Sequence, residues 1–87
     1  MNAVEQKILL DQIITAYKNT YVGRNRRTLE SVERDLEVFF ARKVDERTLV
    51  DIGAEFGVSR NTIMVVEAST TRRIAYVLNR LKLKGMF

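Results

Sequence analysis

The stretch TLVDIGAEFGVSRNTIMVVE, residues 48–67, carries the turn signals that decide the fold. Thr48 opens a pattern that resembles a capping box, in which a side-chain oxygen satisfies an early helix N–H. Gly57 suits the left-handed position that ends a helix, and Ser59 suits the cap of a second helix. Gly53 is the small residue that two steeply crossing helices need where their backbones approach. The spacing therefore predicts two helices around a tight turn.

Apolar residues flank this predicted crossing in register. The inward-facing set is Ile52, Phe56, Val58, Ile63 and Val66. In a DNA-binding helix-turn-helix, the start of the second helix faces the major groove. Helical geometry exposes there Ser59, Arg60, Asn61, Met64, Val65 and Ala68, with Thr62 at the edge. Met64 and Val65 are unusual in that position because they cannot donate hydrogen bonds to bases.

The whole chain predicts an all-α fold, a compact single domain (1–87) of four to five helices containing a helix-turn-helix. Eighty-seven residues form one small domain, and the absence of proline lets helices run uninterrupted. Apolar residues at three- and four-residue steps predict helices over about 3–20 and from about 29 to 42. The last helix can reach Leu83. Between the first two helices, Gly23 and Asn25 suit a turn and Thr28 suits an N-cap.

The charges divide the chain unevenly. Residues 1–55 hold nine Lys/Arg and ten Asp/Glu, whereas residues 56–87 hold six Lys/Arg and one acid. A basic end on a nearly neutral body indicates an anionic partner such as nucleic acid, or a solvated tail that aids solubility. The outer face of the second helix is predicted to be solvated, with Glu30, Glu33, Arg34, Asp35 and Glu37 on it.

The composition excludes several classes of function. The chain has no cysteine and no histidine, so it has no disulfide, no thiolate or imidazole metal site and no Cys or His nucleophile. We expect no enzyme, no cofactor, no metal and no small-molecule substrate. The longest apolar runs, such as residues 63–66, are too short to cross a membrane, and no signal peptide is recognisable. A cytoplasmic protein is expected.

Residues 48–75, TLVDIGAEFGVSRNTIMVVEASTTRRIA, resemble the stretch TLEEIGxxFGVSRERIRQIExxALRKLR of primary sigma factors of bacterial RNA polymerase. That stretch belongs to their last, promoter-recognition domain (region 4). The match is close from Thr48 to Arg60, and the resemblance extends over about residues 29–80. The N-terminal helix lies outside it. The resemblance implies a sigma-like regulator, bacterial or phage-encoded, that binds the minus-thirty-five promoter element and docks on the polymerase flap.

The departures from the family fall on the residues that read bases. The family's Glu-Arg is Asn61-Thr62 here, and its Arg-Gln is Met64-Val65. A target other than the usual promoter sequence is therefore expected. The family's promoter-melting domain has no counterpart in these 87 residues, so a protein other than a complete sigma factor is expected.

The leading prediction is a sigma-like transcription regulator that binds double-stranded DNA and the core of bacterial RNA polymerase. The resemblance puts Thr48 and Leu49 at the DNA backbone. Arg72 and Arg73, two turns further along the second helix, are expected to contact phosphate or solvent instead of bases. The predicted DNA-binding residues are Thr48, Leu49, Ser59, Arg60, Asn61, Thr62, Met64, Val65, Arg72 and Arg73.

Two alternatives remain open. The first is a free-standing repressor or packaging protein that forms a homodimer through the apolar face of the first helix, with Leu10, Ile14 and Tyr17 at the interface. The same face can instead pack into the domain's own core. The second alternative is an interaction protein in which Met64 and Val65 contact another protein instead of DNA.

Overall fold

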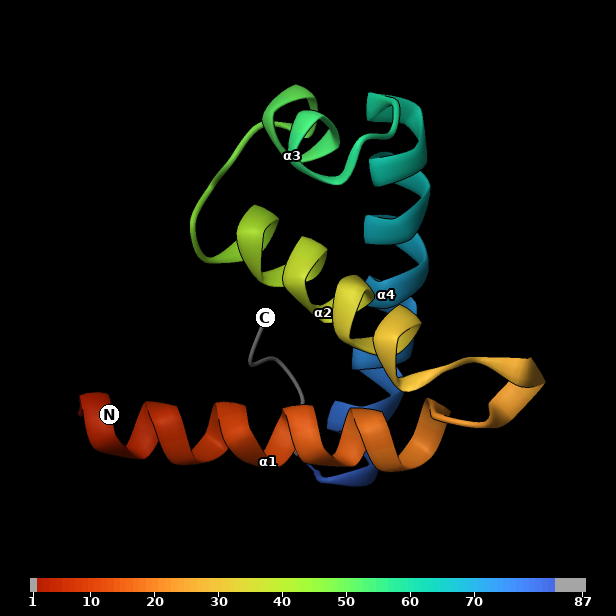
Figure 1. The fold of residues 1–87 in the computed structure, drawn as a ribbon. Coiled ribbons are helices and arrows are strands. Elements are labelled where there is room, and N and C mark those ends of the chain that lie inside the picture. Colours follow the sequence, from red (N-terminus) through yellow and green to blue (C-terminus); the bar gives the residue numbers. More distant parts are fainter. Residues whose placement is uncertain (1, 83–87) are drawn as a thin grey trace.

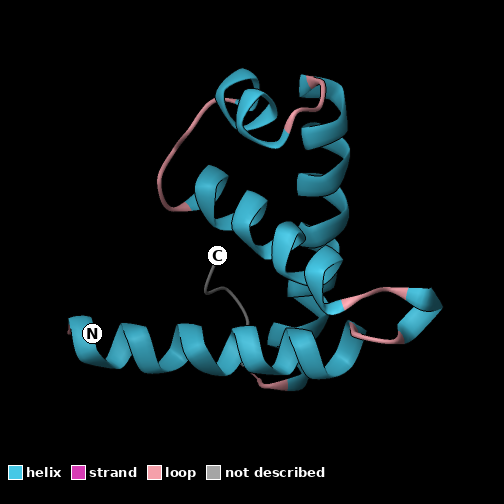
Figure 2. Ribbon diagram, viewed as in Figure 1, coloured by secondary structure: helices cyan, strands magenta, loops and turns pink. Residues whose placement is uncertain are grey.

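All secondary structure in the described part of the chain is helical (Figure 2). The computed structural model describes residues 2–82. It contains the four helices α1 (Ala3–Tyr21), α2 (Leu29–Lys43), α3 (Leu49–Phe56) and α4 (Arg60–Arg80), and one 3-10 turn, η1 (Arg24–Arg26). The predicted all-α class is confirmed, and each predicted helix is present. α4 ends at Arg80, and the predicted end at Leu83 lies outside the described residues.

The connection between α1 and α2 forms as the sequence predicts. Gly23 has a φ of 85° and Asn25 a φ of 50°, so both adopt the left-handed conformation that the turn requires. Arg26, with a φ of 62°, follows them. The Thr28 hydroxyl then accepts the backbone N–H of Ser31 at 3.1 Å and starts α2.

Helix α4 is the element around which the others are arranged (Figure 1). It packs against α1, α2 and α3, whereas α1 and α3 lie at opposite ends of it. The N-terminal half of α1 extends away from the other helices in Figure 1, and its Val4 and Ile8 are exposed. The helix-to-helix contacts of α1 are therefore concentrated in its C-terminal half.

Two hydrophobic clusters form the core. The larger one joins α1, α2 and the C-terminal half of α4, and consists of Ile13, Tyr17, Val32, Leu36, Phe39, Ile74, Val77 and Leu78. The smaller one joins the end of α2 to α3 and the N-terminal half of α4, and consists of Val38, Ala41, Ile52 and Ile63. The smaller cluster fixes the position of α3 against α4, which determines what the start of α4 presents to solvent.

Asp35 departs from the solvated face on which the sequence pattern puts it. Its side chain is only 3% exposed and lies among three guanidinium groups. It hydrogen-bonds Arg27 of the α1–α2 connection, and its distances to Arg34 of α2 and Arg73 of α4 are 3.4 and 3.7 Å. Helical periodicity alone predicted exposure for this residue, and that prediction is wrong. The carboxylate is buried because neighbouring elements supply its counter-charges.

The described residues contain neither a membrane span nor a metal-binding cluster. None of the helices within residues 2–82 has the length and hydropathy that crossing a bilayer requires. The same residues hold no group of three or more acidic, cysteine or histidine side chains arranged to bind a metal ion.

Candidate nucleic-acid interface

The turn between α3 and α4 depends on two glycines. Gly57 has a φ of 69° and ends α3 in the left-handed conformation. Gly53 lies inside α3, and its carbonyl accepts the N–H of Val58 at 2.9 Å. A Cβ atom on Gly53 would lie 2.7 Å from the Val58 carbonyl oxygen. Because no ordinary carbon approaches a backbone oxygen so closely, the turn packs against α3 only when this residue is glycine.

Both predicted caps at the turn are present. The Thr48 hydroxyl accepts the N–H of Asp51 at 3.1 Å, and the Ser59 hydroxyl accepts the N–H of Thr62 at 3.2 Å. Asp51 directs its carboxylate to Arg47, with 2.8 Å between Nε and Oδ2. These contacts fix where α3 and α4 begin, and therefore which residues occupy the first turn of α4.

The inward-facing residues of the turn occupy the positions that the sequence predicts, with one exception. Ile52 and Ile63 are buried, and Phe56 and Val66 pack against the same cluster. Val58 is 41% exposed instead. Its backbone carbonyl faces Gly53, so the close approach is made by the main chain and the side chain is left in solvent.

The start of α4 presents a polar and apolar surface to solvent. We call Arg60, Asn61, Met64 and Val65 the reading row, because all four are exposed at this end of the helix. Met64 is 49% exposed and Val65 is 63% exposed. Within residues 2–82, Arg60 takes part in no ion pair, so its charge is available to a ligand.

The remaining predicted contacts at this end differ in exposure. Ser59 and Thr62 are exposed and hydrogen-bond each other, with 3.1 Å between their hydroxyl oxygens. Thr48 is exposed, whereas Leu49 is half-buried and packs against the smaller cluster. Ser59 and Thr62 thus lie beside the reading row at the start of α4. Leu49 contacts the smaller hydrophobic cluster in addition to its predicted place at the DNA backbone.

An ion pair that the sequence reasoning missed fastens α4 to α2. Glu67 accepts a hydrogen bond from Arg42 at 2.6 Å and lies 3.8 Å from the Lys43 ammonium. Arg42 also donates to the carbonyl oxygen of Arg47 at 2.7 Å. One guanidinium therefore holds the end of α2, the loop before α3 and the middle of α4. The only signal in the sequence was Glu67, the single acid of residues 56–87.

Arg72 and Arg73 occupy different environments although both were predicted to contact phosphate or solvent. Arg72 is exposed, and its guanidinium is 3.4 Å from the Ser69 hydroxyl. Arg73 is half-buried, pairs with Asp35 and lies 5.8 Å from the centre of the Tyr21 ring. Consecutive helix residues point about 100° apart, so one guanidinium reaches solvent and the other reaches the helix junction. Arg73 therefore has an internal structural contact.

The charges at the junction also affect Arg27. Burial lowers the pKa of Arg27, and the positive charges of Arg73 and Arg34 lower it further. This direction is expected where one carboxylate, that of Asp35, serves three guanidinium groups. The junction between α1, α2 and α4 therefore carries excess positive charge.

The residues predicted for a dimer interface lie mostly inside the domain. Tyr17 is completely buried in the larger cluster, so its prediction as a surface contact is wrong. Ile14 packs against the same cluster, and Leu10 is half-buried. The apolar face of the C-terminal half of α1 is used by the domain's own core, because α2 and α4 cover it. Met64 and Val65, the other interface candidates, are exposed.

Comparison of the chain with models of protein families, with curated proteins and with solved structures finds no match to any of them. The resemblance to the sigma-factor domain therefore stays a prediction from the residues.

Proposed function

We propose that this protein is a transcription regulator that binds double-stranded DNA through a helix-turn-helix formed by α3 and α4. The observation that carries the proposal is the exposed reading row at the first turns of α4, directly after the glycine-dependent turn. The caps and the smaller cluster hold this end of the helix in one position, which a groove contact requires. Within residues 2–82, the exposed side chains of Arg60 and Asn61 have no hydrogen-bond or ion-pair partner, which supports recognition of an external ligand.

The chemistry of the reading row suits a mixed set of base contacts. Arg60 can donate two hydrogen bonds to guanine, and Asn61 can pair with adenine. Met64 and Val65 can pack on thymine methyl groups, which are the apolar feature of the major groove. The expected target therefore contains thymines beside one or two positions that are read by hydrogen bonds.

The strength of such binding indicates a second partner. Each good pair of hydrogen bonds to a base discriminates by about 1–3 kcal/mol, and the reading row offers at most two such residues. A single copy therefore binds DNA weakly. Docking on core RNA polymerase, which the resemblance to sigma factors implies, would raise the effective concentration at the promoter.

The DNA half of the proposal is tested by selecting bound sequences from a random duplex pool and measuring their affinity by fluorescence anisotropy. Asn61→Ala should weaken binding to the selected sequence by about 5- to 150-fold, corresponding to about 1–3 kcal/mol, and relax the preference at one position. Asn79→Ala is the matched control, because Asn79 is an exposed asparagine at the far end of the same helix. Equal affinities for the two variants would refute groove reading by α4.

The polymerase half is tested by retention of core RNA polymerase on the immobilised protein. A primary sigma factor, added as competitor, should displace the polymerase if both use the same docking surface. No retention, or retention that the competitor leaves unchanged, would refute sigma-like docking while leaving DNA binding unaffected.

A protein-interaction function is the second candidate, and the exposure of Met64 and Val65 favours it. Both side chains are apolar, and methionine suits adaptable contacts with protein surfaces. Met64→Arg distinguishes the two functions. Under groove reading it adds a charge beside the DNA and changes both affinity and salt dependence, whereas under the alternative it abolishes a protein contact and leaves DNA binding unchanged.

A further inference from the structure

Two adjoining hollows lie between α1, the η1 turn and the C-terminal half of α4. The first, of about 540 Å³, is lined among others by Arg24, Arg80 and Thr20. The second, of about 400 Å³, is lined among others by Arg24, Arg72 and Tyr76. Arg24 belongs to both hollows and therefore connects them. We call the two hollows together the arginine cleft.

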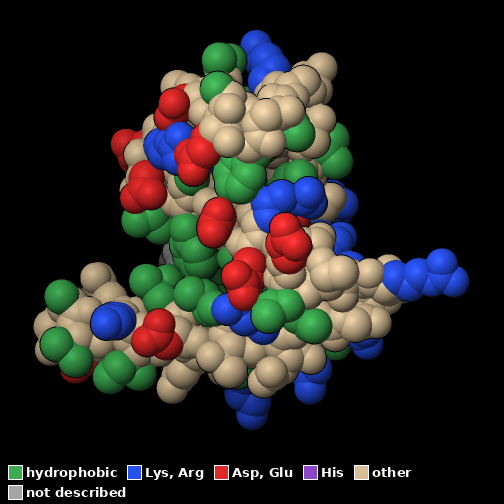
Figure 3. Space-filling model, viewed as in Figure 1, with side chains coloured by type: hydrophobic (Ala, Val, Ile, Leu, Met, Phe, Trp, Pro, Cys, Tyr) green, Lys and Arg blue, Asp and Glu red, His purple; other side chains and the backbone are tan. Residues whose placement is uncertain are grey.

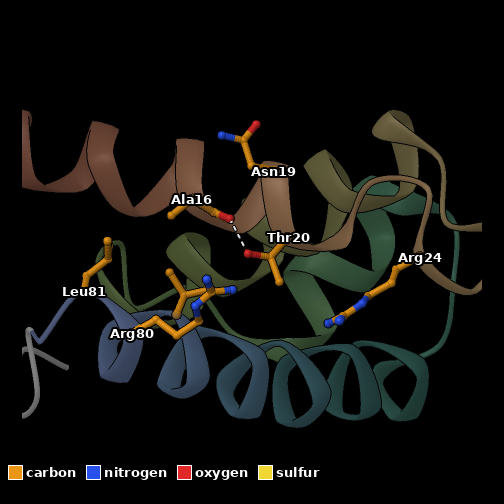
Figure 4. A pocket seen from close by; sticks show the side chains of 7 residues that line it. Ala16, Asn19, Thr20, Arg24, Arg80 and Leu81 are labelled. Atoms are coloured by element: carbon orange, nitrogen blue, oxygen red, sulfur yellow. Dashed lines mark hydrogen bonds between the residues drawn. The ribbon is translucent and has the colours of Figure 1, made fainter.

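Four arginines line the arginine cleft, and three of them have no ion-pair partner within residues 2–82. Figure 4 shows Arg24 and Arg80 reaching into the first hollow from different elements, the η1 turn and α4. Within residues 2–82, neither of them nor Arg72 takes part in an ion pair. Among the described residues, neither hollow is lined by an aspartate or a glutamate. Because like charges repel, an anion between these groups would lower the energy of the arrangement.

Three other hollows among the described residues do not share this imbalance. In the view of Figure 3, carboxylates gather over α2 and α3. Three other hollows are each lined by at least one carboxylate, from Glu33 in two of them and from Asp11 in the third. Asp35, at the junction behind the cleft, already contacts three guanidinium groups, including Arg73 of the second hollow. Among these hollows, only the arginine cleft therefore gathers several unpaired arginines without a carboxylate in its lining.

The spacing of the arginines matches a chain of anions better than a single one. Arg72 and Arg80 are eight residues apart on α4, which corresponds to about 12 Å along the helix. One strand of B-DNA carries a phosphate about every 3.4 Å along the axis, so this length accommodates about three to four phosphates. Arginine is also the side chain best suited to phosphate, because its planar fork donates two parallel hydrogen bonds.

We propose that the arginine cleft binds the phosphodiester backbone of a nucleic acid through Arg24, Arg72 and Arg80. The cleft is a surface distinct from the reading row, since Arg60 and Arg72 are about 18 Å apart along α4. The contact is independent of base sequence, because phosphates carry no sequence information. It extends the proposed function to a second face of the protein and does not rest on base reading by α4.

The test removes the three charges and measures the salt dependence of binding. Arg24→Gln, Arg72→Gln and Arg80→Gln are combined in one variant, and the affinity for a labelled duplex of random sequence is measured between 50 and 200 mM salt. Each lost phosphate contact should reduce the slope of log affinity against log salt by about 0.9. Over that fourfold range, the affinity of the wild type should therefore fall about 40-fold more than that of the variant.

Two controls make the result specific. Lys7→Gln removes another exposed and unpaired charge, on α1 away from the cleft lining, and should leave the slope nearly unchanged. Circular dichroism and thermal unfolding establish that the triple variant is folded. A folded triple variant with the slope of the wild type would overturn the proposal.

Two further measurements distinguish phosphate binding by the cleft from binding of an acidic protein and from base reading by α4. Poly-glutamate is the probe for an acidic protein partner; if the triple variant loses poly-glutamate binding but keeps the wild-type slope with DNA, the nucleic-acid assignment is overturned. Asn61→Ala should change the preference among sequences and leave the slope unaltered. The salt slope could depend on the cleft arginines while the protein shows no preference among DNA sequences. That result would support phosphate binding by the arginine cleft and refute base reading by α4.

Discussion

Substituting the two glycines of the α3–α4 turn should destabilise the protein for two different reasons. Gly53→Ala puts a Cβ atom 2.7 Å from the carbonyl oxygen of Val58, which is backbone and cannot rotate away. Forcing an extra methyl group into packed surroundings costs about 1–3 kcal/mol. Replacing a glycine inside a helix by alanine regains about 1 kcal/mol, so a net loss of up to about 2 kcal/mol is expected.

Gly57 presents the opposite situation. A Cβ atom on Gly57 would meet nothing within 4 Å, but its φ of 69° is unfavourable for any residue with a side chain. Gly57→Ala should therefore cost about 1–2 kcal/mol through the backbone alone. Asparagine tolerates the left-handed conformation, so Gly57→Asn should recover much of the loss. Gly53→Asn should recover none, because its Cβ atom meets the same oxygen.

Urea unfolding followed by circular dichroism measures these differences. The midpoint should shift at constant m-value, because the surface exposed on unfolding is unchanged. For a domain of this size, 1 kcal/mol corresponds to about 4–8 °C in the melting temperature. Ala54→Gly, at the neighbouring exposed position of α3, calibrates the helix-propensity contribution. A Gly53→Ala protein that gains as much stability as Ala54→Gly loses would refute the close approach of the turn to α3.

Three further substitutions test the junction of α1, α2 and α4. Asp35→Ala should lower the free energy of unfolding by about 3 kcal/mol, since it removes the buried carboxylate that three guanidinium groups share; a loss below about 1 kcal/mol in urea titration would contradict this role. Tyr17→Phe should be neutral or stabilising by up to about 1 kcal/mol, because the buried hydroxyl has no hydrogen-bond partner among residues 2–82. A clear loss of stability in calorimetry would contradict a buried hydroxyl without a partner. Burial raises the pKa of Tyr21 in the folded protein above its ordinary value of 10.0. The neutral Tyr21 side chain therefore contributes its full stabilisation below pH 10, and this contribution is lost as the pH rises through the pKa of the folded protein. Tyr21→Phe should therefore flatten the decline of stability above pH 10, and an unchanged decline would show that another group causes it.

Local structure was predictable from the sequence where a single residue type determines it. Thr28, Thr48 and Ser59 cap the helices that the sequence assigns to them, because a hydroxyl before an apolar helical pattern has few other local uses. Gly23 and Gly57 adopt the left-handed conformation, since glycine alone does so without steric cost. Caps and left-handed turns depend on residues that are close together in the sequence, so they can be predicted without knowledge of the tertiary structure.

Contacts between distant elements were not predictable in the same way. Asp35 has the helical position of an exposed residue, and its burial depends on arginines from the α1–α2 connection and α4. Arg72 and Arg73 are adjacent and chemically identical, yet only Arg73 reaches Asp35. The arginine cleft likewise depends on η1 and α4 lying side by side, although Arg24 is far from Arg80 in sequence. Pairing partners at these separations require the tertiary arrangement.

The central position of α4 has a consequence for the order of events during synthesis. α4 follows the other three helices in the chain and packs against each of them, so α1, α2 and α3 lack its contacts until it is made. Ile74, Val77 and Leu78 complete the larger cluster only after they have left the ribosome exit tunnel. A ribosome adds about 5–20 residues per second, so the earlier helices wait for seconds with their apolar faces uncovered. Chaperone contacts with the nascent chain should therefore be concentrated on α1 and α2, and should end when α4 emerges.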